Sequence, residues 1–471
     1  MISFLSSIAF LLFGYLLYGR LTEKVFSPDE RETPAIANAD GVDAVPLPRW
    51  KSFLIQLLNI AGTGPIFGAL MGAVFGPVVF LWIILGAVLA GAVHDYMCGM
   101  LSSRHQGESI AVLTGKYLGR VPKFIMRVFC VVLLVLCGTV FITSPAALLA
   151  RLTPESLDQN FWVNIIVLYY ILATLLPIDK LIGRLYPVFG VILIVMAVSV
   201  AAAILLLPGY QIPEITLANL HPEELPVWPY MFVTVACGAI SGFHATQCPV
   251  IAKCITREKQ GRSVFYGAMI SESVIALIWA AAGMTVYGST GALKAALDSV
   301  GQSGVVYDIS NGLLGVAGGL LAVIGVVICP ITSGDTAFRS ARLILAEWTG
   351  LKQGPIKNRL IITIPLLFVG AGLTAMDFNV LWRYFSWSNQ TLAMVALWVA
   401  SAYLIREAKK KWFSLLTAFP AAFMTAVSAT YILMAEEGMK MPSRVACPVG
   451  IAAALAAFVI SLVKVKKEKR A

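Results

Sequence analysis

Two groups of polar residues and helix breakers interrupt long apolar stretches of this chain. The first group lies in 58–70, and its candidate binding residues are Asn59, Gly62, Thr63 and Gly64. The second lies in 235–251, and its candidates are Ser241, Gly242, His244 and Gln247. Backbone that leaves the helical conformation inside a membrane is tolerated only where it lines a protein-enclosed site. The two groups therefore predict one buried site for a small molecule, built from both breaks.

A proline lies within or just after each group, at Pro65 and Pro249. Proline suits the first turn of a helix, so each one predicts the start of a new half-helix. The free N–H groups and the positive dipole end of such a helix attract an anion, and we expect a carboxylate there. The alternative interpretation is that the glycines only allow close helix packing and the prolines only kink their helices.

A third motif, Cys329–Arg339, offers hydroxyl and carboxylate oxygens beside a proline and a glycine. Hard cations such as Na⁺ prefer oxygen ligands. The predicted cation ligands are Thr332, Ser333, Asp335 and Thr336. Asp335 is also a candidate proton carrier. Alternatively, Asp335 forms an ion pair with Arg339 one helical turn later, and the two roles are compatible.

Glu272 lies near the middle of another apolar segment. An ionisable side chain at that depth is costly, so it is a functional candidate by default. We predict that Glu272 carries a proton, although the sequence does not identify its partner.

Two HxxxC pairs, His94 with Cys98 and His244 with Cys248, each place an imidazole and a thiol on one helical face. Such donors suit a transition metal. The alternative is coincidence, with histidines that only form structural hydrogen bonds. The sequence contains no phosphate-binding loop and no Ser/His/Asp constellation, so we expect neither an enzyme nor ATP-driven transport.

The elements that must position these residues are membrane-spanning helices. Apolar residues make up 59% of the 471 residues and charged residues 13%, against about 25% charged in soluble proteins. Apolar runs of ~20 residues, long enough to span a bilayer, recur along the chain. We predict about thirteen spans, at 2–19, 53–72, 77–101, 122–150, 162–177, 185–207, 227–250, 263–287, 305–338, 358–375, 379–403, 412–433 and 447–463.

Basic residues are distributed unequally between the two sides that these spans define. Of the 35 Lys and Arg, 30 fall on one side, four on the other and one, Arg383, near a helix end. The positive-inside rule then places the N-terminus outside and the C-terminus in the cytoplasm. The net charge of +10 therefore reflects membrane topology, and we expect no nucleic-acid partner.

The order of the predicted spans repeats. Aligning the first broken span with the second gives two five-helix halves, 53–207 and 227–403, which cross the membrane in opposite directions. Residues 1–52 precede them as one helix and a cytoplasmic loop. Two further spans lie in 412–463, and 464–471 is a basic tail. The predicted fold is an all-α polytopic membrane protein with a five-plus-five inverted-repeat core.

Several long strings resemble the carbon starvation protein A family of bacterial peptide and pyruvate transporters. They span about residues 50 to 405, and the clearest are Asn59–Ala69, Gly91–Tyr96, Met100–Ile110, Ser241–Gln247, Thr332–Arg339 and Trp382–Gln390. The resemblance implies an inner-membrane secondary transporter that imports small peptides or pyruvate by alternating access, linked to carbon starvation. It also implies kinship with the amino acid–polyamine–organocation superfamily, whose leucine-transporter-like core has five plus five helices.

In sodium-coupled relatives of that superfamily, a cation sits between the first broken helix and the eighth core helix. The resemblance would transfer that site to the backbone of 59–62 and to Thr332, Ser333 and Thr336. The segment 185–207 lacks the lysine of some proton-coupled relatives, so Na⁺ and H⁺ both stay open as coupling ions. We expect no other cofactor, and as partners only the small solute and the lipid bilayer. A channel and a transition-metal transporter are the rival functions, and the sequence sets no oligomeric state.

Overall fold

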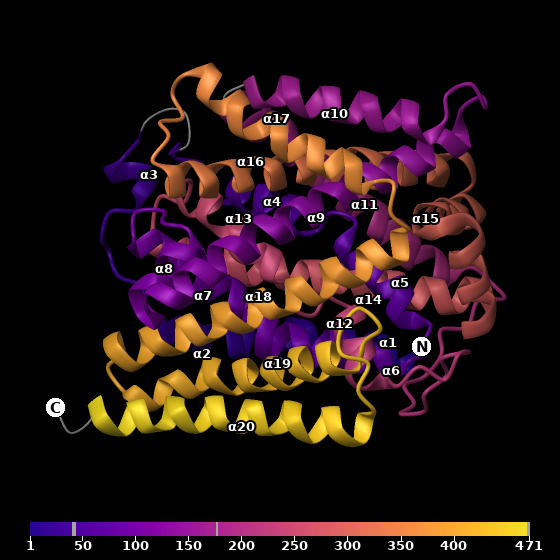
Figure 1. Cartoon of the computed structure of the whole chain (residues 1–471). Helices are drawn as coiled ribbons and strands as arrows, with labels where there is room; N and C mark the ends of the chain where they lie inside the picture. The colour runs from indigo at the N-terminus through magenta and orange to yellow at the C-terminus, as the bar shows by residue number, and fades with distance from the viewer. Residues whose placement is uncertain (40–43, 176–177, 469–471) are drawn as a thin grey trace.

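A computed structural model describes residues 1–39, 44–175 and 178–468, and these residues form helices joined by loops, without strands. The long helices run roughly parallel to one another, as Figure 1 shows. The parts of the predicted segments at 40–43, 176–177 and 469–471 lie outside the described residues. The predicted all-α membrane fold is confirmed.

The first half of the chain contains α1 to α11. Their bounds are Ile2–Phe13 (α1), Gly19–Phe26 (α2), Pro34–Ala37 (α3), Arg49–Ile60 (α4), Gly64–Ala73 (α5), Val78–Gly86 (α6), Ala92–Arg104 (α7), Ile110–Leu118 (α8), Arg120–Leu152 (α9), Gln159–Leu175 (α10) and Ile178–Leu206 (α11). Short π-helical turns at Gly14–Tyr18 and Ala87–Gly91 join α1 to α2 and α6 to α7 into continuous spans.

The second half contains α12 to α20. Their bounds are Phe232–Thr234 (α12), Gly242–Ala252 (α13), Gly267–Tyr287 (α14), Thr290–Val323 (α15), Cys329–Thr349 (α16), Ile356–Leu373 (α17), Phe378–Glu407 (α18), Leu415–Met434 (α19) and Ser443–Glu468 (α20). Gly301 and Gly315 have positive φ and kink α15, so the predicted span 305–338 is not one straight helix.

Ten helices among the described residues are long and apolar enough to span a membrane, and the bent pair of α4 and α5 brings the number to eleven. Of the other predicted spans, 162–177 corresponds to the shorter α10, and 227–250 is divided into α12 and α13. Each of the thirteen predicted segments is thus helical over at least part of its length. The chain is a multi-pass membrane protein.

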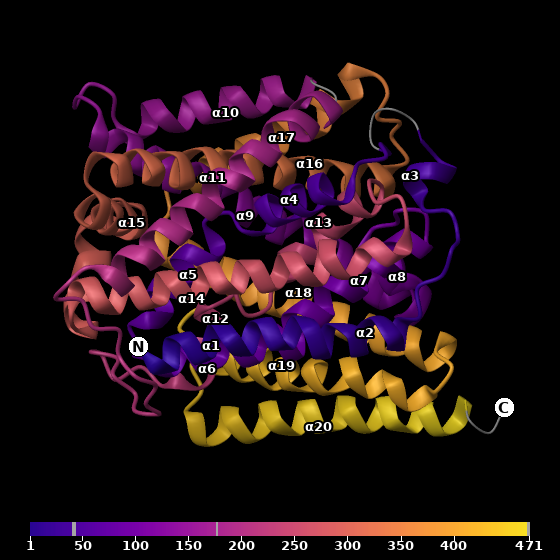
Figure 2. The same cartoon turned by 180° about the vertical axis from the view of Figure 1, so that it is seen from behind.

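The two breaks lie inside the helical assembly. The axes of α4 and α5 differ by 48° across Ala61–Thr63, and seven residues, Val235–Ser241, separate α12 from α13. In Figures 1 and 2, α10 lies along one edge of the molecule and α20 along the opposite edge, with α4, α5, α13 and α14 between them. The breaks are therefore enclosed by protein, as the unpaired backbone of a broken membrane helix requires.

Candidate functional site

The two breaks contact each other, although about 175 residues separate them in the sequence. A Cβ atom added to Gly64, the first residue of α5, would lie 2.6 Å from Sγ of Cys237 in the second break. One added to Gly68 would lie 3.3 Å from the carbonyl oxygen of Thr234. Only glycine allows the backbone of α5 to approach the unwound segment this closely. Gly64, which was predicted to belong to the site, and Gly68 thus allow the two breaks to meet.

Polar atoms without partners surround the first break. The side chains of Asn59 and Thr63 are fully buried, and neither the amide of Asn59 nor the hydroxyl of Thr63 forms a hydrogen bond with the described residues. Pro65 occupies the first turn of α5, as predicted. The first turn of a helix leaves N–H groups free, and a buried polar group without a partner is costly. This end of α5 is therefore suited to a small polar or anionic ligand.

The second break ends differently from the prediction. Helix α13 begins at Gly242, and Pro249 lies inside it, so the prediction that Pro249 opens a half-helix is wrong. The reason is that the chain unwinds upstream, where Gly238 has φ +85° and Ser241 is extended. A helix loses only one hydrogen bond at an internal proline, because proline lacks the N–H that would donate it.

A side chain from α18 occupies the start of α13. Oδ1 of Asn389 accepts hydrogen bonds from the backbone N–H of Phe243 at 2.6 Å and from the hydroxyl of Ser241 at 3.1 Å. Its Nδ2 donates to the carbonyl oxygen of Ala236 at 2.9 Å. Asn389 therefore binds both the unwound segment and the first turn of α13, where it occupies the N–H of Phe243.

A chain of titratable side chains lies behind the second break. Nδ1 of His244 is 2.8 Å from Oδ2 of Asp95, and Nδ1 of His94 is 2.8 Å from Oδ1 of the same carboxylate. All three side chains are buried. An ionised carboxylate only accepts hydrogen bonds, so each imidazole donates its Nδ1–H to Asp95. This arrangement leaves Nε2 of His244 facing away from Asp95.

Glu272 on α14 lies at the other side of that imidazole. Its Oε2 is 3.4 Å from Nε2 of His244, and its Oε1 accepts from the backbone N–H of Gly238 at 3.2 Å. Neither Nε2 of His244 nor Oε2 of Glu272 forms a hydrogen bond with the described part of the chain. A neutral imidazole nitrogen and an ionised carboxylate are both acceptors, so they repel unless a cation lies between them. The pair can hold one proton, on either residue.

The pair has a third donor atom beside it. Sγ of Cys237, Nε2 or Nδ1 of His244 and a carboxylate oxygen of Glu272 lie within 4.8 Å of one another. Thiolate, imidazole and carboxylate are the ligands that Zn²⁺ and similar metals use. The arrangement can therefore also hold a transition metal.

The two predicted HxxxC pairs are neighbours in space, because α7 and α13 pack against each other. Sγ of Cys98 is 3.7 Å from Nε2 of His94, and the thiol of Cys248 donates to the backbone carbonyl of Asp95 at 3.6 Å. Metal binding by the four residues stays a prediction.

The predicted cation ligands lie on the continuous helix α16. The hydroxyls of Thr332 and Thr336 donate to carbonyl oxygens within α16, and that of Ser333 donates to the carbonyl of Leu58 at 3.2 Å. Ser333 therefore connects α16 to the first break. Oδ2 of Asp335 is 3.2 Å from the guanidinium of Arg339, which is the ion pair considered from the sequence. Binding of Na⁺ here stays a prediction.

Sequence comparison assigns the chain to a family. The profile described as carbon starvation protein CstA matches residues 1–156 and 153–311, more than half of the chain. The chain belongs to this family.

Relatives within the CstA family differ in what their names state. A Haemophilus influenzae protein named only as an uncharacterized membrane protein is 41% identical over 64% of this chain and 95% of its own length. The Bacillus subtilis peptide transporter CstA is 26% identical over 89% of this chain and 88% of its own length. The Escherichia coli pyruvate/proton symporter BtsT is 27% identical over 58% of this chain and 47% of its own length. The named relatives are transporters, not enzymes.

Solved structures confirm the leucine-transporter-like fold of this CstA-family chain. MhsT in complex with L-phenylalanine superposes with a TM-score of 0.57 at 12% identity, over 89% of this chain and 99% of that one. The Eremococcus coleocola manganese transporter mutant H236A superposes with a TM-score of 0.53 at 14% identity, over 91% and 99%. These likenesses concern the fold alone.

Two hollows approach the breaks of this CstA-family protein from opposite ends. One, of 190 Å³, is lined by residues that include Thr234, Trp382 and Ser386. The other, of 240 Å³, is lined by residues that include Thr246 and Ser340. Gln247 lies beside the second hollow, since its Nε2 donates to Thr246 and Ser340. Asn59, Thr63 and His244 between the hollows are fully buried. The site is thus closed from both sides.

Three residues of the site were missing from the predicted set, namely Asp95, Cys237 and Asn389. Asp95 follows a histidine inside an apolar helix, and Asn389 belongs to the polar run Ser388–Gln390 in the middle of α18. Both patterns are costly in a membrane and mark candidates. Cys237 has no such signal, because a lone cysteine is common in apolar helices.

Proposed function

We propose that this protein is a secondary active transporter that imports a small carboxylate solute, a short peptide or pyruvate, driven by the proton gradient. Proton coupling is proposed because two acceptor atoms, Nε2 of His244 and Oε2 of Glu272, face each other at 3.4 Å. One proton between them satisfies both atoms. When the proton leaves, the two acceptors repel each other, so the contact between His244 on α13 and Glu272 on α14 depends on proton occupancy.

The substrate would bind at the two breaks. Relatives named for peptide transport and for pyruvate/proton symport both act on solutes that carry a carboxylate. In this proposal the first turn of α5 binds that carboxylate, with Asn59, Gly62, Thr63 and Gly64 around it. From the second break, Ser241, Gly242, His244 and Gln247 would line the opposite wall. The close approach of Gly64 to Cys237 supports a site formed by both breaks.

The mechanism in this proposal is alternating access. The two hollows at Thr234 and Thr246 lie on either side of buried polar residues, as in a transporter closed at both ends. Opening of one hollow at a time would expose the breaks to one side of the membrane and then to the other. The inverted halves 53–207 and 227–403 are the parts that would move relative to each other.

The proposed location is the bacterial inner membrane, with the N-terminus outside and the C-terminus in the cytoplasm. The support is the distribution of basic residues, of which 30 of 35 lie on the predicted cytoplasmic side. The family name supports a role during carbon starvation.

Uptake by proteoliposomes tests the proposal most directly. Purified protein would be reconstituted and given labelled pyruvate or labelled dipeptides, with an imposed proton gradient, an imposed Na⁺ gradient or no gradient. We expect saturable uptake that requires the proton gradient and is unaffected by Na⁺. Uptake driven by Na⁺ alone would indicate Na⁺ coupling, for which the predicted ligands are Thr332, Ser333, Asp335 and Thr336. Uptake of neither solute under any gradient would refute the proposed substrates.

A transition metal is the rival occupant of the acceptor pair, favoured by the proximity of Cys237. Elemental analysis of the purified protein decides between the two. A metal that is present in stoichiometric amount and is lost in both Cys237→Ser and His244→Ala would show that this site binds a metal rather than a proton. A channel is the other rival, and flux that does not saturate with solute concentration would favour it.

A further inference from the structure

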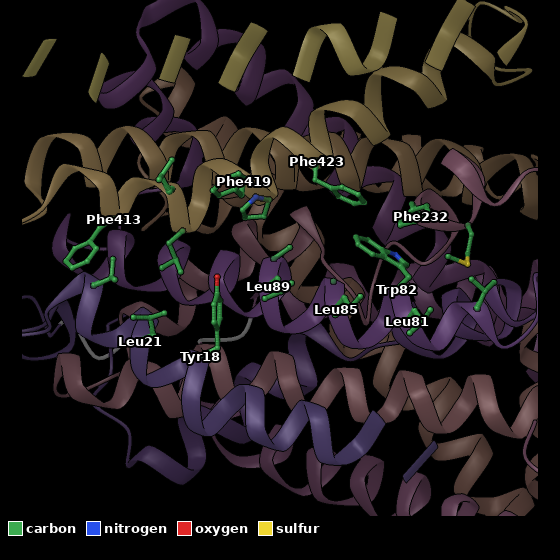
Figure 3. Close-up of a pocket in the computed structure, with 18 of the residues that line it drawn as sticks. Tyr18, Leu21, Leu81, Trp82, Leu85, Leu89, Phe232, Phe413, Phe419 and Phe423 are labelled. Atoms are coloured by element: carbon green, nitrogen blue, oxygen red, sulfur yellow. The ribbon is translucent and has the colours of Figure 1, made fainter. Parts of the chain in front are cut away.

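A long apolar groove runs along one flank of the molecule. It has a volume of 910 Å³ and lies between α19 on one side and α2 and α6 on the other (Figure 3). Its walls include Leu21, Leu85, Leu89, Phe419 and Phe423, which point into it in the figure. Phe419 is 61% exposed and Leu89 43% exposed. Apolar side chains that are exposed on a membrane-spanning flank face hydrocarbon.

The groove is long enough to hold an acyl chain of one leaflet. On one wall alone its lining residues run from Trp412 to Phe423, and eleven residues of helix correspond to roughly 17 Å. One leaflet contributes about half of a hydrocarbon core that is ~30 Å thick. The hydroxyl of Tyr18 points into the groove, as Figure 3 shows, so a polar group lies beside a bound acyl chain.

The end of the groove at Trp412 carries positive charge. Four exposed basic residues lie next to its lining residues on two elements, Arg20 and Lys24 around Leu21, and Lys409 and Lys410 before Trp412. The acidic residues at this end are Glu407, which is exposed, and Glu23, which pairs with Arg262 at 3.0 Å. A net positive rim beside an apolar groove matches a molecule with an anionic head and apolar tails.

We propose that this groove is a binding site for an anionic phospholipid. The acyl chains lie between α19 and α6, and the phosphate contacts the basic rim formed by Arg20, Lys24, Lys409 and Lys410. The lipid belongs to the leaflet at this end, which is the cytoplasmic one in the proposed orientation. Each basic side chain near a membrane surface strengthens such binding by roughly fivefold. The proposal depends neither on the transported solute nor on the coupling ion.

Native mass spectrometry of the full chain tests the proposal, with phosphatidylglycerol and phosphatidylcholine of the same acyl chains as probes. We expect one tightly retained phosphatidylglycerol and at least tenfold weaker retention of phosphatidylcholine. The double variant K409Q/K410Q should reduce phosphatidylglycerol retention roughly tenfold or more. Leu89→Trp, which fills the groove, should remove retention of both lipids. The matched control is K352Q/K357Q, which neutralises two exposed lysines, Lys352 in the loop between α16 and α17 and Lys357 in the first turn of α17.

Three results would overturn the proposal. Equal retention of the two lipids would show that the basic rim does not recognise a headgroup. Equal losses in K352Q/K357Q and K409Q/K410Q would show that net charge alone attracts the lipid. A dimer that dissociates in Leu89→Trp would show that a second copy of the chain, rather than a lipid, fills the groove.

Discussion

Nδ1 of His244 lies 2.8 Å from Oδ2 of Asp95, a residue 149 positions earlier in the chain. Because Asp95 fixes the Nδ1 proton, the opposite nitrogen of His244 is directed at Glu272. A contact on one side of the ring thus determines the chemistry on the other side.

Glu272→Gln is expected to reduce proton-driven uptake at least tenfold. The amide has nearly the same shape but cannot exchange a proton, so it keeps the packing of α14 and removes the carrier. The measurement is uptake by proteoliposomes with and without an imposed pH gradient. Glu155→Gln is the control, because Glu155 is an exposed carboxylate in the loop between α9 and α10. Undiminished gradient-driven uptake in Glu272→Gln would exclude this residue as the carrier.

Asp95→Asn is expected to shift the pH dependence of uptake to lower pH. The variant removes the negative charge beside His244, so a higher proton concentration is needed to load the pair. A residue with a purely structural role would lower the rate at every pH without moving the midpoint. The measurement is the initial uptake rate from pH 5 to pH 8, compared with the unchanged protein. An unmoved midpoint would mean that Asp95 does not act on His244.

Gly64→Ala is expected to disturb the contact of the two breaks. The added Cβ would lie 2.6 Å from Sγ and 2.9 Å from Cβ of Cys237, and overpacking of this kind costs about 1–3 kcal/mol. Cys237→Ala removes the sulfur and should restore part of the loss in the double variant. The measurement is the thermal unfolding temperature of the two single variants and the double variant. Additive losses would show that the two residues do not meet.

Asn389→Leu is expected to destabilise α13 without a change in volume large enough to disrupt packing. The variant leaves the buried N–H of Phe243 and the carbonyl of Ala236 without partners, at about 1–3 kcal/mol each. Thr391→Val is the control on the same helix, because it removes a hydroxyl that contacts Ser428 rather than the break. A lower unfolding temperature in Asn389→Leu than in Thr391→Val checks the prediction, and equal temperatures would contradict it.

The stability of the end of α7 is expected to fall in weak acid because of His105. Burial lowers the pKa of His105 below its ordinary value of 6.5, and the ring contacts the carbonyl of Leu101 and the hydroxyl of Tyr117. The unfolded chain therefore binds a proton more readily than the folded one, so stability decreases as the pH falls through 6.5.

The check is the unfolding temperature at pH 7.5 and pH 5.5. His105→Gln should show a smaller difference between the two than the unchanged protein. The charged groups near the ring are Glu108, Lys116 and Glu407. An equal difference in both proteins would assign the pH dependence to one of these groups.

Much of the fold could be predicted from the sequence, because the length of an apolar run and the placement of helix breakers are local properties. The break before Pro65 was predicted for this reason. The start of α13 was not, because Asn389, a residue of α18 far along the chain, stabilises it. For the same reason the sequence identified Glu272 but not its contact with His244, since that contact depends on where the fold places the two side chains.

The cap that Asn389 provides for α13 also limits how the molecule can move. Phe243 N–H has one partner, and that partner belongs to α18. If α13 tilted alone, the buried N–H of Phe243 would lose this partner at a cost of about 1–3 kcal/mol, which favours movement of α18 with α13. We therefore expect α13 and α18 to move together. A movement of α18 would therefore reach the second break through Asn389, and the first break through the contacts of Phe67 in α5 with Phe378 and Trp382.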